Sequence, residues 1–188
     1  VCSSDLPTDH GFDHIAWGDM AALDAAITDN TAGVIVETVQ GEGGIRPLTA
    51  EMLSHIRQVC DARGLLLILD EVQCGVGRSG TLFAYETFGI EPDILASAKG
   101  LGGGFPIGAC LVSEKVGQHM VVGTHGSTFG GNPLAAAVGN AVLDLVFEPG
   151  LLENVRKQAD TLRAGLEELV SECPAVLSKV SGLGLMIG

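Results

Sequence analysis

The stretch "LLLILDEV" at residues 65–72 decides the fold. Five aliphatic residues run without a polar interruption and end on Asp70 and Glu71. A short, continuous apolar run is typical of a strand that is covered on both faces, as strands of a parallel sheet are. Ligands of open α/β sheets bind beyond the carboxyl ends of the strands. An acidic residue directly after such a strand therefore lies where a ligand would bind.

The segments on either side of this strand predict an α/β fold with a mostly parallel sheet. The helix expected at 49–64 has Thr49 as a plausible N-cap and Gly64 at its end. A second helix begins with Asn132 and Pro133, which suit a cap and a first helical position. The remaining expected strands are 33–40, 94–99 and 107–113, and the remaining expected helices are 132–147 and 151–173.

Charge and composition exclude several classes of partner. The formal net charge is −13, so the chain would repel nucleic acid and anionic membranes, and we expect neither as a partner. The longest aliphatic run, 65–69, is too short to span a membrane. The five cysteines form no C-x-x-C and the five histidines have no metal-binding spacing. This usage predicts a protein of the reducing cytoplasm without a metal site.

A lysine, Lys99, ends the strand expected at 94–99, in the stretch "ILASAKGLGGGFPIGA" at 94–109. An amine at a strand end can form a Schiff base with a carbonyl, as an aldolase lysine does. Taken alone, Lys99 is at least as readily explained by a side chain that faces solvent, and Asp70 by a residue that anchors a loop. Together they fit pyridoxal 5′-phosphate (PLP), whose chemistry needs a lysine and an acid partnering the ring nitrogen. The hydroxyls of Ser127 and Thr128, ahead of a helix, suit the phosphate.

Two other motifs favour different interpretations. "LLLILDE" has the form of a Walker B strand, which would place Asp70 on Mg²⁺ in an ATPase. That function needs a G-x-x-x-x-G-K-[ST] loop, which this sequence lacks. "GVGRSG" at 75–80 matches G-x-G-x-x-G. Asp70 and Glu71 directly before it would repel a pyrophosphate, so a glycine turn is the better interpretation.

The longer pattern carries a family resemblance. "LLILDEVQCGVGRSGTLFAYETFGIEPDILASAKGLGGGFPIGA", followed by "GTHGSTFGGNPLAAAV" and preceded by "VETVQGEGGIRP", resembles the class III (ω-amino acid) aminotransferases of PLP fold type I. The resemblance runs from about residue 11 to 188 and is closest to the acetylornithine branch. It implies that 11–148 form part of the PLP-binding large domain and 149–188 the start of a smaller α/β domain.

The resemblance also implies a role for each residue of the cofactor site. Lys99 would carry PLP as a Schiff base and move a proton once substrate displaces it, and Asp70 would pair with the pyridine nitrogen. Val72 would pack on the ring, and Gln73 would reach the side of its phenolic oxygen. Thr128 would contact the phosphate, usually that of the partner subunit, which implies an obligate homodimer. The full cofactor-binding set implied is Lys99, Asp70, Glu71, Val72, Gln73 and Thr128.

Two residues are implied on the substrate side. Glu42 resembles an acidic gate that pairs with an arginine in one half-reaction and releases it to a substrate carboxylate in the other. Ser127 would lie near the substrate. The alternative for Glu42 is a solvated loop acid, although its place in the motif favours the gate, and the alternative for Ser127 is a hydroxyl at a helix entry. Cys74 stands where the family more often has Thr and is interpreted as a packing residue, and Arg78 follows the family pattern without an assigned role.

The reaction implied is transfer of the terminal amino group of N-acetylornithine to 2-oxoglutarate, in arginine biosynthesis. Ornithine, 4-aminobutyrate and succinyl-diaminopimelate remain alternative donors, and the ATPase remains the alternative of a different class.

The ends of the chain also carry expectations. The first ten residues, "VCSSDLPTDH", fit no pattern and are expected to be foreign or disordered. The family's phosphate-binding glycine-rich helix and its ring-stacking aromatic residue would lie upstream, and the arginine of the gate downstream. We therefore expect this segment alone to bind PLP poorly.

Overall fold

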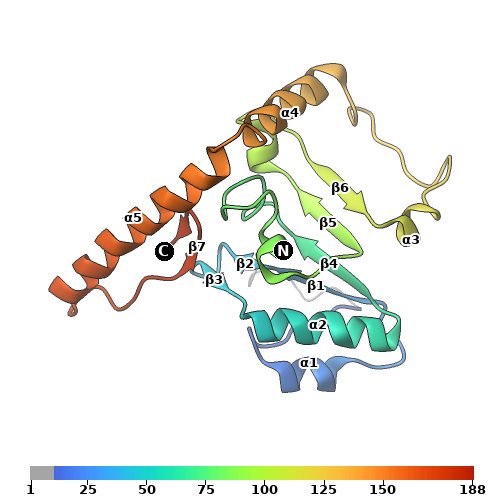
Figure 1. Ribbon diagram of the computed structural model, residues 1–188. Coiled ribbons are helices and arrows are strands. Elements are labelled where there is room, and N and C mark those ends of the chain that lie inside the picture. The colour runs from blue at the N-terminus through green and yellow to red at the C-terminus, as the bar shows by residue number, and fades with distance from the viewer. Residues whose placement is uncertain (1–10) are drawn as a thin grey trace.

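A computed structural model describes residues 11–188 (Figure 1), so the expectation for residues 1–10 lies outside the described residues. The elements of the first half are α1 (Met20–Ala26), β1 (Gly33–Glu37), β2 (Val39–Gln40), β3 (Arg46–Pro47), α2 (Ala50–Arg63), β4 (Leu66–Asp70) and the 3₁₀ turn η1 (Ala84–Phe88). Those of the second half are β5 (Ile94–Ser97), the 3₁₀ turn η2 (Lys99–Gly102), β6 (Ala109–Val112), α3 (Glu114–Gly117), α4 (Pro133–Val146), α5 (Leu151–Glu172), β7 (Gly182–Leu183) and β8 (Met186–Ile187).

The central sheet has the strand order β1-β4-β5-β6. β1, β4 and β5 run parallel, and β6 is antiparallel to β5. The prediction of an α/β fold with a mostly parallel sheet is confirmed. The register places Asp70 opposite Glu37 on one side and Ala96 on the other. The carboxyl ends of three parallel strands therefore meet at one edge.

Helix α2 covers one face of this sheet, as Figure 1 shows. Its ends are as predicted: the Thr49 hydroxyl accepts the Met52 N–H at 3.1 Å, and Gly64 ends the helix at φ 69°. The side chains buried between helix and sheet include Leu53, Ile56, Leu67 and Leu69, each at most 1% exposed. Each such burial stabilises the fold by about 1.5–3 kcal/mol. This layer is the main hydrophobic core.

The opposite face of the sheet is less covered than the sequence predicts. Along β4, Leu67 and Leu69 are buried, whereas Leu66 and Ile68 are only half-buried. Ile35 on β1 is 53% exposed. The prediction that β4 is covered on both faces is wrong for this chain, because α2 packs on one face alone. A continuous apolar strand can be buried on both faces. Its composition does not show whether other elements actually cover both faces.

The single strand predicted at 33–40 is two strands. β1 ends at Glu37, and after the buried Thr38 the chain enters β2, which pairs with β3 in a separate antiparallel ribbon. The sequence pattern does not reveal the break, because apolar residues lie on both sides of Thr38. Near the carboxyl end, β7 and β8 pair as an antiparallel hairpin.

Helices α4 and α5 form the arm that crosses the upper left of Figure 1. The Asn132 side chain caps α4 by accepting the Ala135 N–H at 2.9 Å, as the sequence predicts. The proposed domain boundary at 148–149 falls in the turn between the two helices. Within residues 11–188 no helix alone is long and apolar enough to cross a membrane, and only α4 and α5 together, bent by 70°, reach that length and composition.

Asp93, just before β5, is bound from two sides. Its Oδ2 accepts the Leu67 N–H at 2.8 Å and the Arg57 guanidinium at 3.0 Å. Burial opposes its ionisation, but the Leu67 N–H and Arg57 outweigh burial and hold the pKa of Asp93 below its usual value. A lowered folded-state pKa gives stability that is present above the unfolded pKa and is lost as pH falls through the folded one.

We expect Asp93→Asn to lower the free energy of unfolding at pH 7 by about 1–3 kcal/mol, because Arg57 loses one of its two carboxylate partners and keeps only the exposed Asp61. The difference from wild type should shrink below about pH 4, where the unfolded-state carboxyl is protonated. Urea unfolding followed by circular dichroism at the two pH values measures both effects. Equal stability of the two proteins at pH 7 would contradict the assignment.

Candidate functional site

Asp70 and Lys99 lie at the same edge of the sheet. Asp70 is the last residue of β4, and Lys99 follows β5 after one intervening residue, with Ala96 as the register partner of Asp70. Lys99 has φ 42°, a left-handed conformation that few non-glycine residues adopt and that tends to occur at functional sites. The glycine-rich segment then turns the chain back, with Gly103 at φ 53° and Gly104 at φ 111°.

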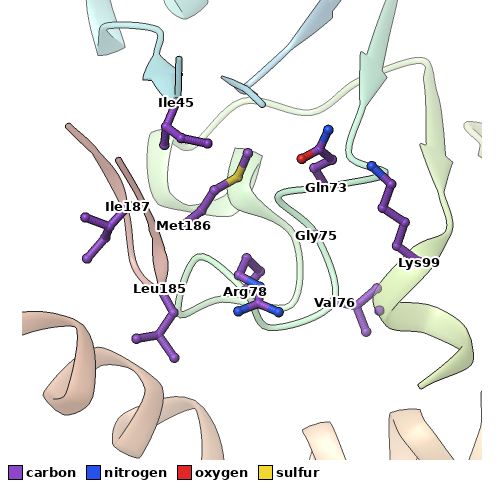
Figure 2. Close-up of a pocket in the computed structure, with 10 residues that line it drawn as sticks. Ile45, Gln73, Gly75, Val76, Arg78, Lys99, Leu185, Met186 and Ile187 are labelled. Carbon is purple, nitrogen blue, oxygen red and sulfur yellow. The ribbon is translucent and has the colours of Figure 1, made fainter. Parts of the chain in front are cut away.

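A pocket of about 380 Å³ opens beside this edge (Figure 2). Its polar side chains are Gln73, Arg78 and Lys99, and Figure 2 shows the Lys99 chain extending along the wall that also carries Gln73. The rest of the lining is apolar or backbone and comes partly from the β7–β8 hairpin: Ile45, Gly75, Val76, Gly100, Leu185, Met186 and Ile187. A largely apolar wall with a few polar groups is typical of a small-molecule site.

The Asp70 carboxylate is oriented by its own turn. Its Oδ1 accepts the Val72 N–H at 3.0 Å, which fixes the side chain at the end of β4. Among residues 11–188 no other protein group donates a hydrogen bond to this carboxylate, so Oδ2 is available to a ligand. Val72 is half-buried beside it. Asp70 therefore combines a fixed direction with a free acceptor.

Glu71 differs from the prediction. The side chain is 0% exposed, and both oxygens accept hydrogen bonds from within the protein. Its carboxylate is therefore unavailable to a ligand in the pocket, and we leave Glu71 out of the cofactor-contacting residues. The sequence held a signal for this placement: alternation along an extended chain puts Glu71 on the side of Leu67 and Leu69, and Asp70 on the side of Ile68.

Glu42 and Gln73 form a pair that sequence reasoning missed. The Gln73 side-chain amide donates to Glu42 Oε1 at 3.0 Å. Glu42, which the resemblance assigns as a gate, therefore already has a hydrogen-bond partner in this chain. Gly41 permits the approach, because a side chain there would collide with the Gln73 amide. The two residues are 31 apart in the sequence, and no local pattern could join them. Glu42 itself is exposed.

Ser127 and Thr128 lie in an exposed loop between α3 and α4, which Figure 1 shows extending away from the strand ends. Ser127 Oγ accepts the Gly130 N–H at 2.9 Å. Neither residue lines the pocket beside Lys99. Their assignment to phosphate and substrate stays a prediction.

Metal ligation has no candidate in the part of the chain that the structure describes: no group of three or more His, Cys, Asp or Glu side chains there could hold an ion. The site instead offers an amine, a fixed carboxylate and an amide at one sheet edge. An amine near a carboxylate can form a Schiff base to a carbonyl while the carboxylate stabilises a cation.

The fold and these residues define a class: α/β proteins that present a strand-end lysine and a strand-end aspartate at one edge of a mostly parallel sheet. The chain belongs to the Aminotransferase class-III family, whose profile matches residues 8–188. The resemblance seen in the motifs is thereby confirmed.

Sequence relatives share about half of their positions with this chain. It is 54% identical to the acetylornithine aminotransferase of Mesorhizobium japonicum, covering 97% of this chain and 46% of that relative. It is 56% identical to the acetylornithine aminotransferase of Brucella melitensis, covering 97% of this chain and 45% of that relative. The chain therefore spans less than half the length of the curated relatives it matches.

Solved structures agree on the fold. The N-acetylornithine aminotransferase of Stenotrophomonas maltophilia superimposes with a TM-score of 0.84 at 41% identity, over 94% of this chain and 46% of that one. An ornithine aminotransferase of Toxoplasma gondii, described with partial occupancy of PLP at its active site, superimposes with a TM-score of 0.89 at 36% identity, over 97% of this chain and 43% of that one.

Cys74 lies beside the site but is expected to be inert. Burial, together with the nearby Glu71 charge, raises the pKa of its thiol to about 12, and the side chain is 1% exposed. At pH 8 an alkylating reagent should label Cys173, which is exposed, and leave Cys74 unmodified until the protein unfolds. Peptide-resolved mass spectrometry measures both. Equal labelling rates in the native protein would contradict the packing role.

Proposed function

We propose that the full-length protein is a PLP-dependent aminotransferase that moves the terminal amino group of N-acetylornithine to 2-oxoglutarate. The observation that carries the proposal is the placement of Asp70 and Lys99 at one edge of adjacent parallel strands. Family membership and the names of the relatives support the same activity. The ATPase alternative loses support, because its second acid, Glu71, is buried and bonded inside the protein.

The residues present fit PLP by their chemistry. The ring nitrogen needs an anionic partner, and Asp70 has a fixed carboxylate with one free oxygen. The cofactor aldehyde needs an amine, and Lys99 lines the pocket. When bound, PLP withdraws electrons from the substrate carbon that carries the amino group, which makes its proton removable.

The chain's own residues then have separate tasks. Asp70 would keep a proton on the ring nitrogen through a charge-assisted hydrogen bond, because a carboxylate facing a pyridinium stabilises the protonated form. Lys99 Nζ would hold the cofactor at rest and, once displaced, would take and return a proton at the substrate carbon. Val72 would support one ring face, and Gln73 would reach toward the phenolic oxygen.

Glu42 is the proposed gate, and the Gln73 amide would hold it in place when no arginine is bound to it. Ornithine is the second candidate donor, because the fold also superimposes on ornithine aminotransferases. The proposed assembly is a cytoplasmic homodimer in which Thr128 of one subunit contacts the phosphate at the Lys99 of the other.

Lys99→Ala in the full-length protein should abolish the visible absorbance of bound PLP that borohydride bleaches in wild type. Asp70→Asn should retain some cofactor while lowering kcat by about 10²–10⁴-fold, because the ring is no longer held protonated. Absorbance spectra and amino-transfer assays with N-acetylornithine, ornithine, 4-aminobutyrate and succinyl-diaminopimelate measure the effects. Wild-type turnover in the Lys99 variant would end the proposal, and a preference for another donor would correct the substrate.

Mixing inactive homodimers tests whether Thr128 acts across the dimer. A hybrid of Lys99→Ala and Thr128→Val subunits carries one site with both defects and one with none, if each site combines the two residues from different subunits. Exchange of the two inactive proteins should therefore restore activity, to about one intact site per hybrid. Should both residues serve the same subunit's site, every site keeps a defect and no activity returns.

A further inference from the structure

Three segments far apart in the sequence meet on the Glu71 carboxylate. Oε2 accepts the Ala84 N–H at 2.6 Å, and Oε1 accepts the Tyr85 N–H at 2.8 Å, both from the start of η1. Oε1 also accepts the Thr38 hydroxyl at 3.3 Å, from the junction between β1 and β2. Glu71 itself is the first residue after β4.

This carboxylate is buried without a cationic partner. Glu71 and Thr38 are each 0% exposed, and none of the ion pairs within residues 11–188 includes Glu71. Burial raises the pKa of Glu71, while the N–H groups of Ala84 and Tyr85 and the Thr38 hydroxyl act against that rise. A buried carboxylate in this state depends on its donors, so the three segments are held in one relative position.

The segments that Glu71 joins are those that carry the site. Asp70 directly precedes Glu71. The backbone N–H of Glu71 continues the sheet by donating to the Ala96 carbonyl at 2.9 Å. Gln73 lies in the turn that follows. Thr38 leads through β2 into the loop that presents Glu42, the partner of Gln73. One buried side chain thus ties the Asp70 turn to the Glu42 loop.

We infer that Glu71 is a positioning residue, which holds the Asp70 carboxylate and the Glu42–Gln73 pair in their working arrangement without touching the cofactor. The inference rests on the proposed function and extends it to a residue outside the pocket. Its physical basis is that adjacent residues of an extended chain point to opposite sides, so Asp70 can face the ligand only while Glu71 is anchored in the interior.

The test compares Glu71→Gln with Asp93→Asn in the full-length protein. Both replace a carboxylate that accepts a backbone N–H, fully buried in Glu71 and partly buried in Asp93. Asp93, however, precedes β5, at the edge of the sheet opposite Lys99. Three quantities are measured: the melting temperature of the apoprotein, its dissociation constant for PLP, and the visible circular dichroism per bound PLP. Asp70→Asn serves as the reference for a lost ring contact.

We expect both variants to lower the apoprotein melting temperature. Glu71→Gln alone should weaken PLP binding about tenfold, as loss of a supporting carboxylate does at metal sites, and should change the circular dichroism toward that of Asp70→Asn. It should also lower kcat while the KM for the amino donor changes less. Identical PLP affinity and circular dichroism in Glu71→Gln and Asp93→Asn would overturn the inference.

Thr38 provides a second, milder pair of variants should Glu71→Gln not fold. Thr38→Val removes one donor to Glu71 at nearly constant volume, and Thr38→Ser keeps it. The valine should shift PLP affinity and circular dichroism in the same direction, and the serine should restore both. If Thr38→Val has the PLP affinity and circular dichroism of the wild type, the inference about Glu71 fails and the proposed function stands. If the wild-type protein itself does not bind PLP, both the proposed function and the inference fail.

Discussion

Parallel pairing of β1, β4 and β5 is the constraint on which the rest of this structure depends. Parallel strands end at the same edge, so residues that follow them along the chain are neighbours in space. The register sets Asp70 against Ala96, and Lys99 follows three residues later. A lysine and an aspartate 29 positions apart in the printed sequence are thereby brought to one edge of the sheet.

The site is assembled in two layers. The outer layer consists of Lys99 and Gln73, which line the pocket, and of Asp70, which lies at the same strand ends but is not among the residues that line it. The inner layer is the buried Glu71 carboxylate with its donors from Thr38 and η1. A polar group at such depth is tolerated because every bond it needs comes from backbone and hydroxyl donors already in place.

The two faces of the sheet differ in packing. α2 and the sheet enclose a dense core, whereas the other sheet face and the loop before α4 leave large apolar side chains exposed, among them Ile35 at 53% and Phe129 at 80%. The chain spans less than half the length of its relatives. A continuous apolar sequence therefore indicates that a strand can be buried on both faces, whereas the exposed fraction of its side chains depends on which elements pack against it.

The sequence alone determined the elements with strong local signals. Helix α2 lies between its Thr49 cap and Gly64, α4 begins after its Asn132 cap, and the motifs around Asp70 and Lys99 identified the family. Only the tertiary structure decided that η1 and Thr38 donate to Glu71, that Glu42 meets Gln73, and that the strand predicted at 33–40 divides at Thr38. Capping and periodicity act over a few residues, whereas these contacts join positions more than ten apart, which only the folded chain brings together.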